Sequence, residues 1–362
     1  MNWIKFDATD TWFFRDGRPF NAGEESWANS LFPPYPSVLY GVMRTVFFAN
    51  NMPELSKANT AGDPSARLRI IHYGLCFNDV GLSFPLPADL IRKKGENNLQ
   101  PLQLKTRPPS LVSSYEKHYT HILQSPFPDK SDNLFGQSAL SLPEFCQYLL
   151  GQMPSNAIEF KDYSSPEYKV GLGRNRDTRQ AEEGMLYKVT YRRPTGLVKN
   201  MKNPTRSVSL SVAIDGLSLS DNGLTKFGAD GKLAVFSKLE PTPEMPAAPI
   251  IGKGEIFKMY LATPAIFKEG WAPLALFKKY GLKICTAAIG KPLSIGGWDM
   301  QNKRPKPMRK ALPAGSVYYL QEVESGNAQG FVNAFHAKAL QCVDSLGHQG
   351  FGIAFFGKTK QS

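Results

Sequence analysis

The sequence predicts an α+β fold of two ferredoxin-like units with insertions between their elements. Near the N-terminus, a strand pattern is followed by a helix pattern and then by two strand patterns separated by a turn, which is how a ferredoxin-like unit begins. Strand and helix patterns alternate again in the last third of the chain. The 362 residues, of which 42% are hydrophobic, are enough to build two such units.

The first unit is predicted over residues 1–215. Residues 2–8 alternate as a strand, and residues 36–51 follow as a helix with Pro36 near its first turn. Residues 68–78 and 81–85 are predicted as a hairpin that turns at Asp79 and Val80. The apolar residues of the helix recur at helical spacing and predict one buried stripe: Val38, Leu39, Val42, Met43, Val46 and Phe47.

Two insertions are predicted before this unit ends. Residues 95–165 are rich in proline and serine, with short helical pieces such as LPEFCQYLL, and are predicted to form a surface insertion. Residues 169–206 hold ten Lys and Arg against three Asp and Glu, so +7 of the net charge of +12 lies in 38 residues. Alternation within this segment predicts a basic hairpin with aromatic side chains on one face of an arm: Met185, Tyr187, Val189 and Tyr191.

The second unit is predicted over residues 230–362. Residues 207–214 close the first unit as a strand, and residues 232–239 and 255–264 are predicted as the next two strands, followed by a short helix at 273–281. The segments SIGGWDM and SVYYLQEV flank a basic loop and are predicted to pair as the arms of a hairpin. FVNAFHAKALQCVDS is predicted as the final helix, and IAFFGK as the final strand.

The charge balance points to a polyanionic partner, because the net charge is +12 and the isoelectric point is near 9.4. The four cysteines have no metal-motif spacing and are predicted to be reduced thiols of a cytoplasmic protein. The first residues lack the apolar segment of a signal peptide, and no run of about 18 apolar residues predicts a membrane span.

The opening segment FFRDGRPF interleaves arginine with phenylalanine. A guanidinium group fits phosphate and stacks on bases, and aromatic rings offer faces to unpaired bases. The helix that follows has a second face with small residues, where an RNA backbone can approach its N-terminal end. Alternatively, the arginines pair with Asp16 or Glu24, and the phenylalanines belong to the core. The candidate RNA-binding residues here are Arg15, Arg18, Ser37, Tyr40, Gly41 and Arg44.

The basic hairpin and a later loop are further candidates. A protruding basic hairpin is suited to gripping RNA, although a solvated charged surface has the same composition. The loop QNKRPKPMRK carries five Lys and Arg with no acid, and is predicted either to bind phosphate or to be an exposed loop. The candidates are Arg174, Arg176, Arg179, Tyr187, Arg192 and Arg193 in the hairpin segment, and Lys306 and Arg309 in the loop.

A glycine-rich segment, LGHQGFGIAFFG, precedes the final strand. Glycine tolerates positive φ and lets backbone N–H groups approach an anion, so His348, Gly350, Phe351 and Gly352 are predicted to contact RNA. Alternatively, Gly347 only caps the preceding helix.

No motif for catalysis or metal binding occurs in the sequence. His118 and His121 are the one close pair of histidines, and they lie in a segment without a strong structural pattern. The sequence therefore predicts a binding protein without metal or cofactor. The alternative is RNA cleavage with His348 as general base, for which no paired acid or lysine is evident.

Several motifs together resemble one family. The motifs FFRDGRPF, SLFPPYPSVLYGVMRT, FPLPADL, EEGMLYKVTYRRP, TPAIFKEGWAP, IGGWD, ALPAGSVYYLQ and GFGIAFFG occur in this order. Together they resemble the third-subunit family of the Cmr complex, the type III-B CRISPR effector, from about Trp3 to Gly357.

The resemblance implies a member of the RAMP superfamily with two RRM-like domains. Such a subunit is non-catalytic, holds the 5′ tag of the CRISPR RNA (crRNA), and docks to the large palm-domain signalling subunit and to backbone RAMP subunits. Target RNA would meet it indirectly. Two alternatives remain: a RAMP endoribonuclease that matures crRNA, which would need a histidine near the first helix although none precedes His72, and the equivalent type III-A subunit, against which the RDGRPF segment argues.

Overall fold

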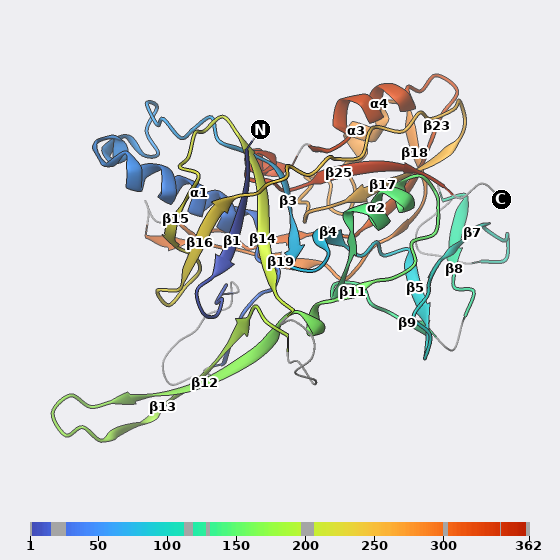
Figure 1. Ribbon diagram of the computed structural model, residues 1–362. Coiled ribbons are helices and arrows are strands. Elements are labelled where there is room, and N and C mark those ends of the chain that lie inside the picture. Colours follow the sequence, from blue (N-terminus) through green and yellow to red (C-terminus); the bar gives the residue numbers. More distant parts are fainter. Residues whose placement is uncertain are drawn as a thin grey trace.

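The computed structural model describes residues 2–15, 27–111, 119–127, 131–196, 206–299, 303–340 and 342–359, and its fold is α+β as predicted (Figure 1). Two antiparallel sheets form the body of the molecule, and a long hairpin projects from one end of it.

The first sheet is centred on β1 (Asn2–Ala8), which lies between β14 (Val208–Asp215) and β16 (Leu233–Lys238). β14 also pairs with β3 (Arg69–Phe77), and seven of its eight residues are buried. The sheet continues outward on both sides through β4 (Gly81–Pro85), β10 (Ser138–Ser141), β11 (Ile158–Glu159) and β15 (Asn222–Lys226).

Helix α1 (Pro36–Asn50) connects β1 with β3. Proline suits its first turn because that turn needs no N–H donor, and its apolar stripe is buried at Leu39, Val42, Met43 and Val46. The helix and the strands at 2–8, 68–78 and 81–85 are therefore confirmed within a residue or so at their ends. A short 3-10 helix, η1 (Met52–Lys57), follows α1.

The second sheet has the order β18-β23-β17-β25-β24. Helix α3 (Leu274–Lys279) lies between β17 (Ile256–Leu261) and β18 (Leu282–Ala288) in the chain. Helix α4 (Ala328–Phe335) lies between β23 (Val317–Glu322) and β25 (Ile353–Lys358), and β24 (Lys338–Ala339) forms the edge. The final strand therefore has the predicted limits.

Two predictions about strand pairing in the second half are wrong. The strand predicted to open the second unit, now β16, pairs with β1 and so belongs to the first sheet. The predicted hairpin of SIGGWDM with SVYYLQEV does not form, because β23 pairs with β17 and β18. Instead, β19 (Leu293–Ile295) pairs with β22 (Arg309–Ala311), and β20 (Trp298–Asp299) with β21 (Arg304–Pro305).

The final helix is also shorter than predicted. It ends at Phe335, because Ala337 adopts a left-handed φ of 57° and donates its N–H to the carbonyl of Ala354 in β25. The remaining predicted helical residues form β24 and the 3-10 helix η3 (Val343–Gln349).

The segment 95–165 is more deeply integrated than a surface insertion. Helix α2 (Leu142–Leu149) buries Phe145 and Tyr148 against both sheets, and β10 pairs with β4. More peripheral elements of this segment are β6 (Leu99–Pro101), β7 (Gln103–Thr106), β8 (His121–Gln124), β9 (Ser131–Asp132) and the 3-10 helix η2 (Phe160–Asp162). β5 (Leu90–Lys93) precedes the segment and pairs with β6 and β9.

The predicted basic hairpin is present and consists of β12 (Ser165–Arg174) and β13 (Ala181–Arg193). A short parallel strand, β2 (Trp27–Asn29), joins β13 and ties the hairpin to the segment before α1. In Figure 1 the hairpin extends far beyond the sheets.

One hydrophobic core spans the junction of the two sheets. Phe355 of β25 contacts Phe84 of β4 at a ring distance of 5.5 Å and Phe145 of α2 at 5.3 Å. The chain passes from the first sheet to the second after β16. The division into two domains, residues 1–215 and 230–362, stays a prediction. Among the described residues, no helix is long and apolar enough to span a membrane.

Candidate nucleic-acid interface

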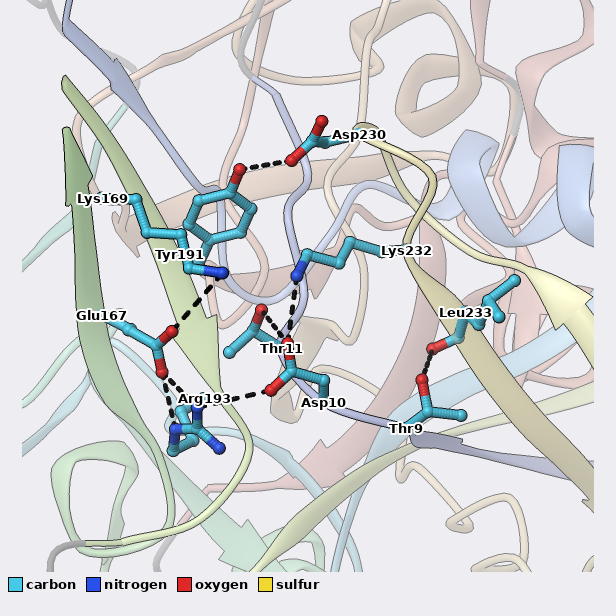
Figure 2. A network of polar contacts seen from close by, with 10 residues as sticks. All are labelled: Thr9, Asp10, Thr11, Glu167, Lys169, Tyr191, Arg193, Asp230, Lys232 and Leu233. Atoms are coloured by element: carbon cyan, nitrogen blue, oxygen red, sulfur yellow. Dashed lines mark hydrogen bonds and ion pairs between the residues drawn. The ribbon is translucent and has the colours of Figure 1, made fainter. Parts of the chain in front are cut away.

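A polar network fixes the base of the hairpin (Figure 2). Arg193 donates to Glu167 across the strand pair, and its guanidinium lies 3.3 Å from Asp10. Lys232 lies 3.2 Å from the same Asp10 carboxylate. Partial burial opposes ionisation of Asp10, but the Lys232 hydrogen bond and the charges of Lys232, Arg193 and Lys169 together outweigh it, so the pKa of Asp10 is lowered. The predicted RNA-binding residue Arg193 therefore already has carboxylate partners.

Tyr191 completes this network. Its hydroxyl donates to Asp230, and the ammonium groups of Lys169 and Lys232 lie 4.7 and 4.6 Å from the centre of its ring. Only 6% of Tyr191 is exposed. The hairpin thus leaves the body of the protein from an anchored base.

The tip of the hairpin is a hydrogen-bonded turn. The Asn175 side chain accepts from the backbone N–H groups of Asp177 and Thr178, at 2.9 and 3.0 Å. The Arg174 guanidinium donates to the carbonyl of Arg179, at 3.1 and 3.0 Å, and so closes the turn. Arg174, Arg176 and Arg179 are all exposed at this far end of the molecule.

The two faces of the hairpin differ. On one face, the ring of Tyr187 covers Gly171, where an added Cβ would lie 2.1 Å from the ring, and Val189 and Tyr191 are buried nearer the base. The predicted alternation of side chains is therefore present. Of its two tyrosines, Tyr187 is 42% exposed, whereas Tyr191 is buried.

The opposite face carries aromatic groups that the sequence analysis missed. The ammonium group of Lys188 lies 4.5 Å from the centre of the Trp27 ring and 4.9 Å from that of Tyr168. Both rings are more than half exposed. Only the pairing of β2 with β13 brings Trp27 here, and no local sequence signal announces that pairing. Exposed aliphatic residues extend this face towards the tip: Val170, Leu172 and Leu186.

The opening segment is divided between core and surface. Phe13 and Phe14 are buried, so the core alternative is correct for these two rings. Arg15 is exposed and bridges through its backbone to Ser30. Arg18, together with Asp16 and Glu24, lies outside the described residues.

Arg44 of helix α1 has an acidic partner that the sequence did not suggest. Its guanidinium lies 2.7 Å from Asp63 and donates to Ser65 at 2.8 Å. On the same helix, Gly41 is exposed with open space around it, and Ser37 and Tyr40 are half-buried. Partial burial raises the pKa of Tyr40, and the charges of Arg44, Asp63 and Arg69 also act on it.

The glycine-rich segment packs tightly against the start of α1 and β3. Gly350 has a φ of 91°, and a Cβ there would lie 2.7 Å from Ile70. The backbone N–H groups of Gly350, Phe351 and Gly352 donate to carbonyls within the chain, at 3.0, 3.3 and 2.8 Å. The amides are therefore committed internally, and Phe351 is 1% exposed, so these glycines serve close packing rather than an anion site.

This packing creates a basic cleft. The start of β3, the edge strand β24 and η3 enclose a cleft of about 690 Å³, which is lined by the cations Arg69 and Lys338 and by His348. Partial burial and the charge of Arg69 lower the pKa of His348. Arg69 and Lys338 were not predicted, because each is an isolated cation in its own strand and only the tertiary fold brings them together.

The remaining predicted residues lie apart from the cleft lining. Lys306 is exposed, and Arg309 pairs with Asp344. Of the predicted histidine pair, His118 lies outside the described residues, whereas His121 contacts the Thr120 hydroxyl at 2.8 Å. Within the described ranges, no group of His, Cys, Asp or Glu could hold a metal ion.

Comparison with models of protein families gives a match over nearly the whole chain. A family model described as CRISPR-associated protein (Cas_Cmr3) matches residues 4–359. No curated protein matches. Among solved structures, the chain is similar to one in a type III-B Cmr-beta complex bound to cognate target RNA and AMPPnP, with 16% identity and a TM-score of 0.50.

A second structure of the Cmr-beta complex, bound to cognate target RNA, gives 17% identity and a TM-score of 0.51. Each alignment covers 88% of this chain and 86% of the other. At such identities these two structures bear on the fold alone.

Proposed function

Because the chain belongs to the Cmr3 family of CRISPR-associated proteins, we propose that it is the non-catalytic subunit that holds the 5′ tag of the crRNA in a type III-B effector complex. The complex would also contain the large palm-domain subunit and the backbone RAMP subunits, with target RNA reached through the crRNA.

The basic cleft is the observation that carries this proposal. Arg69, Lys338 and His348 come from distant parts of the chain and line one cleft between β3, β24 and η3. Among the described residues no carboxylate lines the cleft, so Arg69 and Lys338 are available to phosphate groups. Within the same lining, His348 has no acidic or second histidine partner for proton transfer, which favours binding over cleavage.

The hairpin gives independent support. Its tip carries Arg176 and Arg179, and one of its faces holds Trp27, Lys188 and Tyr168 in contact. Alternating aromatic rings and cations are suited to single-stranded RNA, because bases stack on rings while cations meet phosphates.

The strand orders support a finer assignment of the fold. In the second sheet, chain order β17–α3–β18–β23–α4–β25 with spatial order β25-β17-β23-β18 matches the βαββαβ connectivity of a ferredoxin-like unit. In the first sheet, β16-β1-β14-β3 has the same spatial order, with α1 as its one matching helix among the described residues. We assign both sheets to ferredoxin-like units on this basis.

The test is to measure binding of RNA that carries the host's repeat-derived 5′ tag, against the same RNA with a scrambled tag. Arg69→Ala and Lys338→Ala should each weaken binding, whereas Lys278→Ala should not, because it removes an exposed lysine of α3 that does not line the cleft. Equal binding of both RNAs by the unmodified protein would refute tag recognition. Cleavage of the RNA that is lost in His348→Ala would favour the endoribonuclease alternative, and co-purification with type III-A subunits would favour that assembly.

A further inference from the structure

A column of four aromatic rings crosses the junction of the two sheets. Trp3 of β1 stacks on His72 of β3 at a ring distance of 5.7 Å, and His72 stacks on Phe355 of β25 at 5.9 Å. The ring of His336, which follows α4, meets the ring of Phe355 edge-on at 5.5 Å. All four rings are buried. One histidine from the first sheet and one from the second half of the chain therefore contact the same phenylalanine.

Both ring nitrogens of His336 make hydrogen bonds. The backbone N–H of Phe356 in β25 donates to Nδ1 at 3.2 Å, so Nδ1 carries no proton and Nε2 carries one. Nε2 donates to the carbonyl of Pro246 at 2.9 Å, and Pro246 lies in the segment 239–255 that connects the two sheets. Burial outweighs the hydrogen bond to Pro246 and lowers the pKa of His336, which keeps the ring neutral near pH 7. One imidazole thus fastens both the final strand and the connecting segment to the end of α4.

The two cations of the basic cleft stand close to these two histidines in the chain. Arg69 precedes His72 by three residues in β3, and Lys338 of β24 follows His336 by two residues. Between His336 and Lys338, Ala337 has a left-handed φ of 57° and donates its N–H to a carbonyl of β25. Because this connection is short and hydrogen-bonded, a displacement of His336 also displaces the backbone of Lys338.

We propose that His336 is a positioning residue of the basic cleft, which holds Lys338 across the cleft from Arg69. Its hydrogen bond to Pro246 and its ring contact with Phe355 fix the spacing between β24 and β3. The inference rests on the RNA-binding function proposed above. Strands that already have the right spacing need no further ordering when a phosphate enters, and this preorganisation strengthens binding. His336 does not itself line the cleft, so its effect on RNA passes through Lys338.

The experiment measures the affinity of the full chain for tagged RNA in variants of His336, with thermal unfolding of each variant in parallel. His336→Phe keeps a ring but makes neither hydrogen bond, and it should weaken RNA binding about as much as Lys338→Ala does. His336→Gln places a donor where Nε2 stands, so it keeps the bond to Pro246 and should retain most of the affinity. His336→Asn places an acceptor where Nδ1 stands but does not reach Pro246, so it should bind RNA more weakly than His336→Gln.

A double-mutant cycle separates positioning from general stability. Because His336 acts through Lys338, His336→Phe should have little further effect on RNA affinity when Lys338 is already alanine. His336→Phe should also flatten the slope of log K against log salt by about 0.7, the value for one lost phosphate contact with single-stranded RNA. Phe277→Leu is the matched control, because Phe277 is a buried ring of the second sheet's core that does not line the cleft. This control should lower thermal stability and leave the slope unchanged.

Independent effects of His336→Phe and Lys338→Ala on affinity, or unchanged affinity in His336→Phe, would overturn the positioning role and leave the RNA-binding function intact. If His336→Phe does not fold, the comparison of His336→Gln with His336→Asn decides, and equal affinities in these two variants would overturn the role of the bond to Pro246. Absence of RNA binding by the unmodified protein would overturn the proposed function itself.

Discussion

Lys258 Nζ lies 3.1 Å from Asp89 Oδ2, and both side chains are buried at the junction of the two sheets. The Asp89 carboxylate also accepts from the hydroxyls of Tyr148, at 2.8 Å, and Tyr319, at 2.7 Å. Burial and the nearby carboxylate raise the pKa of both tyrosines, which keeps them protonated as donors. Asp89 precedes β5, Tyr148 belongs to α2, and Lys258 and Tyr319 belong to the second sheet, so one carboxylate ties the two halves of the core together.

Removing one partner of this buried pair should destabilise the protein strongly. Asp89→Ala leaves the Lys258 ammonium buried without its counter-ion, and we expect a loss of about 3–5 kcal/mol in the free energy of unfolding. Urea unfolding measures it. In a double-mutant cycle, the loss in Asp89→Asn with Lys258→Met should be smaller than the sum of the losses in Asp89→Asn alone and Lys258→Met alone, since neither charge is left alone in the double variant. Additive losses would contradict a direct coupling.

Stability should depend on pH through His72. Burial, with the charge of His336, lowers the pKa of His72 to about 4, and its ring stacks on Trp3 and Phe355. The unfolded state therefore binds the proton more readily than the folded state between pH 6.5 and about 4. Stability should fall as the pH falls through this window, by up to roughly 3 kcal/mol from this group.

The check is urea unfolding at several pH values for the unmodified protein and for His72→Phe, which keeps an aromatic ring in the stack. The variant should lose less stability on acidification. An identical pH dependence in both proteins would assign the effect to other groups.

Arg44 should contribute more to stability than to tag recognition. Its guanidinium pairs with Asp63 and donates to Ser65, and the Asp63 side chain is only 8% exposed. Arg44→Ala should therefore cost about 1–3 kcal/mol of unfolding free energy, because the partners lose charge-assisted hydrogen bonds. Discrimination between tagged and scrambled RNA should persist. Lost discrimination with unchanged stability would instead support the RNA contact predicted from the sequence.

The sequence was informative wherever a pattern is local. The limits of β25, the position of α1 and the presence of the basic hairpin all follow from periodicity, proline placement and charge within one segment. The sequence did not predict to which sheet β16 belongs. Its alternating pattern is compatible with a strand of either sheet, and only its pairing with β1 assigns it to the first sheet.

The candidate site shows the same division. The sequence predicts the arginines of the hairpin tip and the exposed face of α1 as candidates. Arg69 and Lys338 become candidates only because the packing of η3 against β3 brings them into one cleft. Asp63, the acidic partner of Arg44, likewise lies 19 residues further along the chain, in a turn with no distinguishing sequence pattern. Glycines 350 and 352 were recognised as special, but their reason is close packing and not an anion.

The hairpin tip should give RNA binding part of its salt dependence. Arg176→Gln removes an exposed charge, and Arg179→Gly removes another while still tolerating the left-handed φ of 54° at that position. Each change should flatten the slope of log K against log salt by about 0.7 for single-stranded RNA. Arg174 is unsuitable for this test because its side chain closes the turn. An unchanged slope would mean that the tip is a solvated surface without phosphate contacts.

The exposed aromatic face of the hairpin should contribute to RNA affinity independently of sequence. Trp27 is 57% exposed and Tyr168 is 59% exposed, yet both rings are held in place, since Lys188 lies between them and the Trp27 indole donates to Thr190 at 3.3 Å. Ordered rings lose little entropy when a base stacks on them, and one stacked base is worth about 1–3 kcal/mol. Trp27→Ala and Tyr168→Ala should each weaken binding of tagged and scrambled RNA alike, by about tenfold or more.

Leu224→Ala is the control, because Leu224 is a similarly exposed apolar residue, at 60%, on the edge strand β15. Unchanged RNA affinity in both aromatic variants, with partner subunits lost from the purified complex, would instead identify this face as a protein interface.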